Sequence, residues 1–487
     1  MSAVPTRTVI DALQLSGLLV STRGVLPDAV HSITDDSRAV VAGSLFLAVR
    51  GSDRDGHDYL DGAQRDGAAA AVVDDPSRTK LPAIVVTDTR RAAAIASAVF
   101  HGEPARELQL IGVTGTNGKT TTVGMLRHLL DEPLSRAASI GTLGVLIGSE
   151  GEELDGGSGL TTPGPVELQR VLRALVDRGV RTVAMETSSH ALHQNRVAGL
   201  QFAAGVFTNL TRDHLDYHVT MEAYLAAKAI LVSLLASHGA AVINADDPAW
   251  SALPATLRTV HFGLHGGDVR AEDLHYGARG SEWSLVVGAE RHPVTLPLIG
   301  DFNVANALGA AAAAWSVGVR PVEIAARLSS MPQVPGRLEI IADAPTVLRD
   351  YAHTPDALER ALDAVRPFTR GKLIAVIGCG GDRDRGKRPE MGRIAEARAD
   401  RVILTSDNPR TEDPERILDD IEAGMTAGRH ERIEDRRDAI ARAIHASSDG
   451  DVVVLAGKGH ETYQIRGTTK YPFDERVIVR EILSEET

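Results

Sequence analysis

The residues with the most specific chemistry form the stretch Gly112-Val-Thr-Gly-Thr-Asn-Gly-Lys-Thr-Thr-Thr122. An apolar run at 108–113 overlaps its start, and apolar residues at helical spacing follow at 123–130. A strand, a glycine-rich turn and a helix in this order predict a phosphate-binding loop, because backbone N–H groups and the helix dipole then point at an anion. Lys119 would reach the terminal phosphates of a nucleotide, and the Thr120 hydroxyl would ligate magnesium.

The spacing of this loop is unusual. Its glycines fall at 112, 115 and 118, and Val113 occupies the slot where the common phosphate-loop pattern has its first glycine. Motor proteins and small GTPases are expected to show the common spacing. The loop therefore disfavours a nucleotide-dependent switch or motor that performs no ligation.

Two further residues could complete a metal site beside this loop. Glu186 ends the β-branched run 180–185, and the carboxyl edge of a strand next to a phosphate loop is where a second magnesium ligand belongs. His214 lies in the polar segment 211–216 and could supply another ligand. The alternative interpretation of His214 is a structural histidine.

Lys228 lies on an apolar face of the predicted helix 223–235, with Tyr224 and Leu231 one turn away on either side. Desolvation lowers the pKa of a lysine, and a neutral amine can add carbon dioxide to give a carbamate, which is an anionic metal ligand. The alternative is a lysine that extends its ammonium group to solvent. The physics of the residues alone favours this second interpretation.

Three polar loops follow the strand-like runs 372–377, 401–405 and 451–455, and we expect them to meet at one edge of a mainly parallel sheet. The loops are Gly378-Cys-Gly-Gly-Asp-Arg-Asp-Arg-Gly-Lys-Arg388, Ser406-Asp-Asn-Pro-Arg410 and Gly457-Lys-Gly-His-Glu461. Arg383 and Arg410 could grip carboxylates in bidentate fashion, while Asp407 and Glu461 could receive ammonium groups. The pattern predicts a site for a zwitterion. Cys379, among glycines, is interpreted as a small buried residue.

Alternating strand-like and helical runs predict an α/β protein with three domains, 1–107, 108–336 and 337–487. The excursion 141–160 is rich in glycine, and a strand is expected at 206–210. Asn303 and Asn306 precede or open an alanine-rich helix near 304–317 and could cap it or contact a base.

The composition disfavours a nucleic-acid-binding protein and a membrane-spanning protein. The 487 residues are 43% hydrophobic and 24% charged, with a formal net charge of −13 and no basic block, so we expect no nucleic-acid partner. The single cysteine fits a reducing compartment. Asp11 interrupts the early apolar stretch, and no apolar run reaches the roughly 18 residues of a membrane span. We therefore expect a cytoplasmic protein without a signal peptide.

With these motifs in view, the chain resembles the Mur ligase family along nearly its whole length. The motifs follow the family order: the phosphate loop, Glu186-Thr-Ser-Ser-His190, Asp213-His214, Lys228, Asn303 with Asn306, and Pro335-Gly-Arg337. Asp-Asn-Pro-Arg and Gly-Lys-Gly-His-Glu resemble the branch that adds the third residue of the peptidoglycan stem peptide, and Asp-Asn-Pro-Arg resembles the version that takes meso-diaminopimelate.

The resemblance implies a fold and a reaction. The fold would comprise a small N-terminal UDP-binding α/β domain, a central phosphate-loop ATP-binding α/β domain and a C-terminal Rossmann-like α/β domain that binds the amino acid. A substrate carboxylate would attack the ATP γ-phosphate, and the incoming amine would then displace phosphate from the acyl phosphate. ATP, two Mg²⁺ ions and carbon dioxide for a carbamate on Lys228 would be required.

The resemblance also assigns residues. The catalytic set would be Lys119, Glu186, His214 and Lys228, and the metal ligands Thr120, Glu186, His214 and carbamylated Lys228. The ATP set would be Gly115, Thr116, Asn117, Gly118, Lys119, Thr120, Thr121, Asn303, Asn306, Arg337, Asp350 and His353. The UDP-muramoyl-dipeptide set would be Ser37, Thr161, Thr162, Ser188, Gln194 and Arg196, with further uridine contacts at Asp53 to Asp55. The diaminopimelate set would be Arg383, Asp407, Asn408, Pro409, Arg410, Gly457 and Glu461.

Other functions stay open at this point. The same ligase could use L-lysine or L-ornithine, although Arg410 would leave a cation unpaired if lysine bound. A folylpolyglutamate synthase shares the loop and the carbamate chemistry, but it would not need a uridine site or a zwitterion clamp. A sensor of muropeptides without turnover is disfavoured by the intact catalytic set. We expect small-molecule partners and a monomer.

Overall fold

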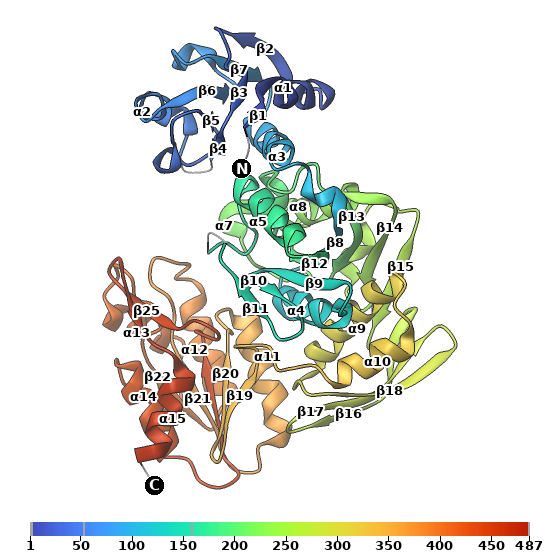
Figure 1. Ribbon diagram of the computed structural model, residues 1–487. Helices are drawn as coiled ribbons and strands as arrows, with labels where there is room; N and C mark the ends of the chain where they lie inside the picture. Colours follow the sequence, from blue (N-terminus) through green and yellow to red (C-terminus); the bar gives the residue numbers. More distant parts are fainter. Residues whose placement is uncertain (1–2, 52–53, 157–158, 486–487) are drawn as a thin grey trace. The chain divides into compact units, whose positions relative to one another are not determined.

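The computed structural model describes residues 3–51, 54–156 and 159–485 (Figure 1). Within these ranges, no helix combines the length and the apolar character needed to span a bilayer. The chain divides into two compact units, of which the first comprises 1–270 with 307–324 and the second comprises 271–306 with 325–487.

The N-terminal region of the first unit is an α/β fold, as the alternation predicted. Its sheet has the order β2-β7-β6-β5-β4, in which β2 pairs antiparallel with β7 and the other pairs are parallel. The strands are β2 (Leu19–Arg23), β4 (Ser32–Thr34), β5 (Ser44–Leu47), β6 (Ala68–Val73) and β7 (Ala83–Val86), beside a small pair of β1 (Val4–Pro5) and β3 (Ala29–Val30). The helices are α1 (Thr6–Leu15), α2 (Leu60–Arg65) and α3 (Thr89–Phe100). One core packs around Val9, Leu13 and Phe100, and another around Phe46 and Leu60.

A long sheet follows, with the order β11-β10-β9-β12-β8-β13-β14-β15-β16-β17-β18. Its strands in the first unit are β8 (Gln109–Thr114), β9 (Arg136–Gly141), β10 (Gly144–Ile147), β11 (Glu152–Leu154), β12 (Val180–Glu186), β13 (Phe202–Phe207), β14 (Leu235–Asn244) and β15 (Thr259–Gly263). β8 lies between β12 and β13, and both pairs are parallel. Strands that follow β8 in the sequence lie on both sides of it in the sheet, β9 and β12 on one side and β13 on the other. In an open α/β sheet, ligands bind at the carboxyl end of the strand where the strand order reverses in this way.

One strand prediction in this sheet was wrong in its bounds, and two strands were not predicted. The glycine-rich excursion 141–160 contains β10 and β11, which extend the sheet through antiparallel pairs with β9 and with each other. The strand expected at 206–210 runs instead over Phe202–Phe207. Short strands with few β-branched residues are recognised by their pairing with neighbours, which the local sequence does not display.

The helices of this region begin where the sequence supplies caps and apolar spacing. They are α4 (Lys119–Leu130), α5 (Pro165–Asp177), α6 (Ser189–His193), α7 (Leu215–His218) and α8 (Met221–Ser233), followed by α9 (Asp301–Ser316) and α10 (Pro321–Ser329). The Thr220 hydroxyl accepts a hydrogen bond from the N–H of Ala223 and so caps α8, and Ser188 caps α6 in the same way. Gly118, in the left-handed region with φ of 84°, is the cap residue directly before α4. Of the two alternatives for Asn303, the capping role is not observed, because its amide donates to the Ile299 carbonyl.

The second unit holds β17 (Gly280–Val287) and β18 (Glu290–Leu296), most of β16 (Val269–Gly277), and a further sheet of order β19-β20-β24-β21-β22-β23. The strands of this sheet are β19 (Glu339–Asp343), β20 (Thr346–Asp350), β21 (Leu373–Ile377), β22 (Arg401–Leu404), β23 (His430–Arg432) and β24 (Val452–Ala456). β19 is antiparallel to β20 and the remaining pairs are parallel, which confirms the predicted mainly parallel sheet. A hairpin of β25 (Tyr463–Arg466) and β26 (Thr469–Pro472) follows.

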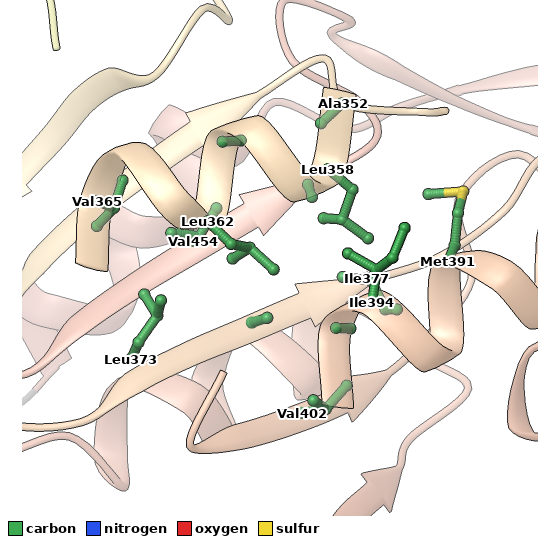
Figure 2. Close-up of a cluster of buried hydrophobic side chains, with 14 of the residues drawn as sticks. Ala352, Leu358, Leu362, Val365, Leu373, Ile377, Met391, Ile394, Val402 and Val454 are labelled. Atoms are coloured by element: carbon green, nitrogen blue, oxygen red, sulfur yellow. The ribbon is translucent and has the colours of Figure 1, made fainter. Parts of the chain in front are cut away.

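Helices cover both faces of this sheet (Figure 1). They are α11 (Pro355–Val365), α12 (Lys387–Arg398), α13 (Pro414–Glu422), α14 (Arg436–His445) and α15 (Glu475–Glu485). Figure 2 shows Leu358 and Leu362 of α11 and Ile394 of α12 packed over Ile377 and Val454 of the strands. Because both faces are buried, the central strands β21 and β24 are apolar along their whole length, and polar residues follow their ends.

Candidate active site

The phosphate loop follows β8 and is tied to the segment that follows β13. The N–H of Thr116 donates to the Asn209 carbonyl at 2.8 Å, and the N–H of Asn117 donates to Asn209 Oδ1 at 2.9 Å. The Thr208 hydroxyl donates to the Asn117 carbonyl at 2.7 Å. A Cβ at Gly115 would lie 1.8 Å from Thr208 Oγ1, so this close approach requires glycine. The loop is therefore held largely through its own backbone.

Lys119 and Lys228 converge on this loop. Lys119 Nζ donates to the carbonyls of Gly115 and Thr116, at 2.9 and 2.8 Å. Lys228 Nζ donates to the same Gly115 carbonyl at 2.7 Å. The structure thus brings together two lysines that are more than 100 residues apart in the sequence, as the catalytic prediction requires.

The alternative interpretation of Lys228, in which its ammonium group extends to solvent, was wrong. The residue is 1% exposed, and its ammonium group lies 4.3 Å from the centroid of the Tyr224 ring. Desolvation by burial lowers the pKa of Lys228 well below its ordinary value, and the charge of Lys119 adds to the effect. The Tyr224 hydroxyl lies 3.3 Å from Thr116 Oγ1, so Tyr224 contacts both the buried lysine and the phosphate loop.

Glu186 and Thr120 meet as predicted. The Thr120 hydroxyl donates to Glu186 Oε1 at 3.0 Å, and both side chains are buried. Sequence reasoning missed Thr142, whose N–H donates to the same oxygen at 2.8 Å and whose hydroxyl lies 3.3 Å from Glu186 Oε2. Thr142 lies in the segment interpreted as a glycine-rich excursion, and its pairing with Glu186 depends on β9 lying beside β12.

His214 lies in a group of aromatic side chains. It adopts the left-handed region with φ of 52°, and its ring lies 4.8 Å from that of His190. His190 also contacts the rings of Tyr217 and His218. Burial lowers the pKa of His190 and of His218 to about 4 in each case, so these rings are neutral near pH 7. Neutral imidazole is the form that binds metals.

The side chains beside the phosphate loop include possible ligands for a metal ion. In the described ranges, no three His, Cys, Asp or Glu side chains are grouped so as to hold an ion. Mg²⁺ instead takes one or two carboxylates together with hydroxyl, water and phosphate oxygens, which the pair of Thr120 and Glu186 fits. Mg²⁺ takes oxygen ligands, and an unmodified lysine has none, so Lys228 fits a magnesium site as the carbamate.

Most residues expected to bind the muramoyl-dipeptide lie together. The Thr162 hydroxyl donates to the Glu186 carbonyl at 2.7 Å and accepts from the N–H of Ser188 at 3.1 Å. Arg196 donates to the Thr162 carbonyl and to Gln194 Oε1, at 2.9 and 2.7 Å. Thr161 belongs to the same group through its hydroxyl, which lies 3.4 Å from that of Thr142.

The expected uridine contacts lie in the N-terminal region. Ser37 begins a short 3-10 helix (Ser37–Ala39) that Asp36 caps. Burial raises the pKa of the nearby Asp35. Asp55 accepts from His57 and pairs with Arg50, and Asp53 lies outside the described residues.

The residues expected to line the adenosine belong to the second unit. The amide of Asn306 lies 3.5 Å from Asn303 Oδ1, and both residues are buried. Asp350, at the end of β20, accepts from the N–H of Leu338 at 2.7 Å, and burial raises its pKa to about 6. The Arg337 guanidinium lies 5.0 Å from the Tyr351 ring centroid, and the ring of Tyr351 lies 4.6 Å from that of His353.

The three polar loops of the second unit meet, as predicted, at the carboxyl ends of β24, β21 and β22. The amide of Asn408 donates to Glu461 Oε2 at 2.7 Å. Sequence reasoning missed Lys458, which is fully buried and lies 3.6 Å from Asp407 Oδ1 and 3.3 Å from Glu461 Oε2. A lysine between glycines on a strand-end loop carries no periodic signal of burial, which explains the omission.

Arg383 and Arg410, the two arginines expected to bind the amino acid, differ in exposure. Arg410 is half-buried, adopts φ of 51°, and donates to the Gly381 carbonyl at 2.8 Å. Pro409 and Gly457 lie beside Asp407 in the same cluster. Arg383 is exposed and donates to the neighbouring Asp382 carbonyl. Cys379 is buried with its pKa raised to about 12, which supports a packing role.

Three family models match the chain. Residues 29–109 match the model described as "Mur ligase family, catalytic domain", residues 113–314 match "Mur ligase middle domain", and residues 336–459 match "Mur ligase, glutamate ligase domain". Together they reproduce the predicted α/β architecture of a Mur ligase in its expected order.

Individual relatives match over almost the whole chain. A UDP-N-acetylmuramoyl-L-alanyl-D-glutamate--2,6-diaminopimelate ligase of Gloeobacter violaceus is 45% identical over 99% of both chains. The ligase of the same name from Geobacillus kaustophilus is 44% identical over 94% of this chain and 96% of its own. A solved structure of a ligase of this name aligns with a TM-score of 0.68 at 34% identity, covering 96% of this chain and 97% of the other. The chain belongs to the Mur ligase family, whose members are ATP-dependent ligases.

Proposed function

We propose that this enzyme joins meso-diaminopimelate to the D-glutamate side-chain carboxylate of UDP-N-acetylmuramoyl-L-alanyl-D-glutamate, using ATP, during the cytoplasmic synthesis of peptidoglycan precursors. The observation that carries the proposal is the cluster of Asn408, Arg410, Lys458 and Glu461 at one edge of the second unit's sheet. The names of the relatives above support the same substrates.

The proposed reaction has two steps. An oxygen of the D-glutamate side chain attacks the γ-phosphorus of ATP, and the bond to the bridging oxygen breaks to release ADP. The amine of diaminopimelate then attacks the acyl carbon of the resulting acyl phosphate, phosphate leaves with its bonding electrons, and the amine loses a proton. Negative charge develops on the transferring phosphoryl group, so correctly placed cations accelerate this chemistry.

The phosphate loop would supply much of that stabilisation. Backbone N–H groups from Gly115 to Thr121 would face the phosphates, since this segment includes the left-handed Gly118 and the first turn of α4. Lys119 hydrogen-bonds to loop carbonyls. Its flexible stem lets the ammonium group reach a terminal phosphate from that position.

Thr120 and Glu186 would hold one Mg²⁺, and His214 with carbamylated Lys228 would hold a second. Bound there, the ions would neutralise charge on the phosphate oxygens. Carbamylation joins the neutral lysine amine to carbon dioxide and releases one proton. The burial of Lys228 supports this modification, because desolvation populates the neutral amine.

The choice of amino acid follows from charge. Lys458 lies beside the carboxylates Asp407 and Glu461, and Arg383 and Arg410 belong to the loops that meet there. meso-Diaminopimelate carries a distal carboxylate beside its second ammonium group, and that carboxylate could pair with a guanidinium of these loops. L-lysine lacks the distal carboxylate and would leave the cation unpaired. The preference for diaminopimelate over L-lysine is expected to be about 10²-fold. L-lysine and L-ornithine remain the alternative substrates of the same ligase.

The remaining assignments complete the proposal. Residues 1–107 would bind UDP through Ser37, residues 108–336 would bind ATP, and residues 337–487 would bind the amino acid. Thr161, Thr162, Ser188, Gln194 and Arg196 would bind the dipeptide. Asn303, Asn306, Arg337, Asp350 and His353 would line the adenosine and its phosphates. We expect the enzyme to act as a monomer in the cytoplasm, without a membrane or nucleic-acid partner.

Phosphate release from ATP tests the proposal. The enzyme is incubated with ATP, Mg²⁺ and the UDP-muramoyl-dipeptide, and candidate amino acids are added one at a time. We expect release that depends on both the dipeptide and meso-diaminopimelate. Release with L-lysine or L-ornithine alone would retain the ligase and reject the charge argument. Turnover with a folate instead of the dipeptide would reject the proposal in favour of a folylpolyglutamate synthase.

A further inference from the structure

Two loops of the second unit carry Arg383 and Arg410, and an ion pair with a fully buried arginine ties these loops together. We infer that the pair of Arg388 and Glu412 positions both guanidinium groups and thereby sets the selectivity for the amino-acid substrate. The inference rests on the proposed function, because it assigns Arg383 and Arg410 to that substrate.

Arg388 lies in α12, directly after the first loop, and its side chain is 0% exposed. Its Nη2 donates to Glu412 Oε1 at 2.9 Å, and its Nη1 donates to Glu412 Oε2 at 3.1 Å. This bidentate arrangement fixes direction as well as distance. Arg388 also donates to Asp420 of α13 at 2.9 Å and to the Gly380 carbonyl at 3.3 Å.

Glu412 forms hydrogen bonds with both loops. It follows Arg410 by two residues, and its own N–H donates to the Pro409 carbonyl at 3.1 Å. Its Oε1 also accepts from the N–H of Asp382, the residue beside Arg383. Hydrogen bonding to Arg388 lowers the pKa of Glu412 to about 2, so the carboxylate is charged throughout the physiological range. One side chain is therefore anchored at both arginine loops.

The two loops touch so closely that a small displacement of one must move the other. The N–H of Gly381 donates to the Asn408 carbonyl at 2.9 Å, and Arg410 donates back to the Gly381 carbonyl at 2.8 Å. A Cβ at Gly381 would lie 1.9 Å from the Pro409 carbonyl oxygen. Arg410 also holds a positive φ of 51°, which a residue with a side chain keeps only when its surroundings impose it.

Arg385 offers a matched comparison on the same carboxylate. Its Nη2 lies 3.0 Å from Glu412 Oε2, but its side chain is 71% exposed. Solvent screens such a surface pair, whereas removing one partner of a buried pair leaves an uncompensated charge. A comparison of Arg385 with Arg388 therefore distinguishes the effect of a buried partner from that of an exposed charge at Glu412.

The test uses the full-length enzyme and steady-state phosphate release with meso-diaminopimelate, ATP and the UDP-muramoyl-dipeptide. Glu412→Gln should raise the KM for diaminopimelate by roughly 10- to 100-fold, because a displacement of about 1 Å at a substrate-binding group has effects of that size. The KM for ATP should change less than about twofold, and the ratio of kcat/KM for diaminopimelate over L-lysine should fall. Arg385→Gln, the control, should leave all of these values within about twofold.

Equal increases in the KM for ATP and for diaminopimelate after Glu412→Gln would overturn the inference, and so would an Arg385→Gln variant that matches it. Arg388→Lys retains the charge but loses the bidentate contact, so it gives a second reading if Glu412→Gln folds poorly. Wild-type enzyme that ignores diaminopimelate but uses another amino acid would reject the proposed substrate. The comparison of Glu412→Gln with Arg385→Gln would then be made on that amino acid.

Discussion

The phosphate-loop site of the first unit and the amino-acid site of the second unit are held together by different interactions. Around the phosphate loop, Lys119 and Lys228 both donate to the Gly115 carbonyl, and the loop is bonded through its backbone to the segment after β13. In the amino-acid site, the side chain of Asn408 is bonded to Glu461 and Lys458, and we infer that Glu412 positions Arg410.

The difference matches the proposed tasks of the two sites. Phosphoryl transfer requires the same stabilisation of negative charge whichever amino acid is added. Backbone N–H groups of the phosphate loop can provide much of that stabilisation. Selection among amino acids depends on where a few charges stand, and side-chain ion pairs place those charges. Substitutions should therefore affect the first site mainly when they remove a reacting or metal-binding group. In the second site, they should affect selectivity even when they remove a supporting contact.

The largest effect is expected from Lys228→Ala, which removes the proposed carbamate. Activity should fall by about 10³-fold, because a charge-stabilising group at the phosphoryl transfer is lost. Formate or acetate should restore part of it by occupying the vacated space as a small carboxylate. The exposed Lys80 supplies the matched control, and Lys80→Ala should retain full activity. Full activity in Lys228→Ala would contradict the carbamate proposal.

Arg410→Ala tests the second site. It should lower kcat/KM for meso-diaminopimelate by about 10²-fold while leaving the KM for ATP nearly unchanged, since the guanidinium is proposed to bind the distal carboxylate. Arg416 lies exposed on α13, so Arg416→Ala controls for the loss of one positive charge nearby. If Arg410→Ala weakened ATP and diaminopimelate equally, the division of labour between the two sites would be wrong.

A smaller effect is expected from Thr142→Val, in which the hydroxyl near Glu186 Oε2 is lost while the backbone N–H still donates to Oε1. The Mg²⁺ concentration required for half-maximal activity should rise by about tenfold, as is common when an outer partner of a metal ligand is removed. Thr142→Ser should behave as the wild type because it retains the hydroxyl. An unchanged Mg²⁺ requirement in Thr142→Val would show that the backbone contact alone orients Glu186.

Much of both sites could be predicted from the sequence, because glycine-rich turns and charged loops after apolar strands are local signals. Glu186, Asn408 and Arg410 belong to this class. Thr142 and Lys458 could not be found in this way, since their importance comes from strand neighbours that are distant in the sequence. The burial of Lys228 also depended on tertiary packing: an apolar helix face does not reveal whether a lysine's amine reaches water or a carbonyl such as that of Gly115.

Tyr224→Phe should have the smallest effect and would measure how far the phosphate loop depends on its backbone. The variant keeps the ring against the Lys228 ammonium group and removes a hydroxyl 3.3 Å from Thr116 Oγ1. Thr116 retains its bonds to Asn209 and Thr211, so kcat and the KM for ATP should change by less than about threefold. A tenfold loss would mean that the Tyr224 hydroxyl holds the phosphate loop as the Thr208 hydroxyl does. The two sites would then differ less in their dependence on side chains.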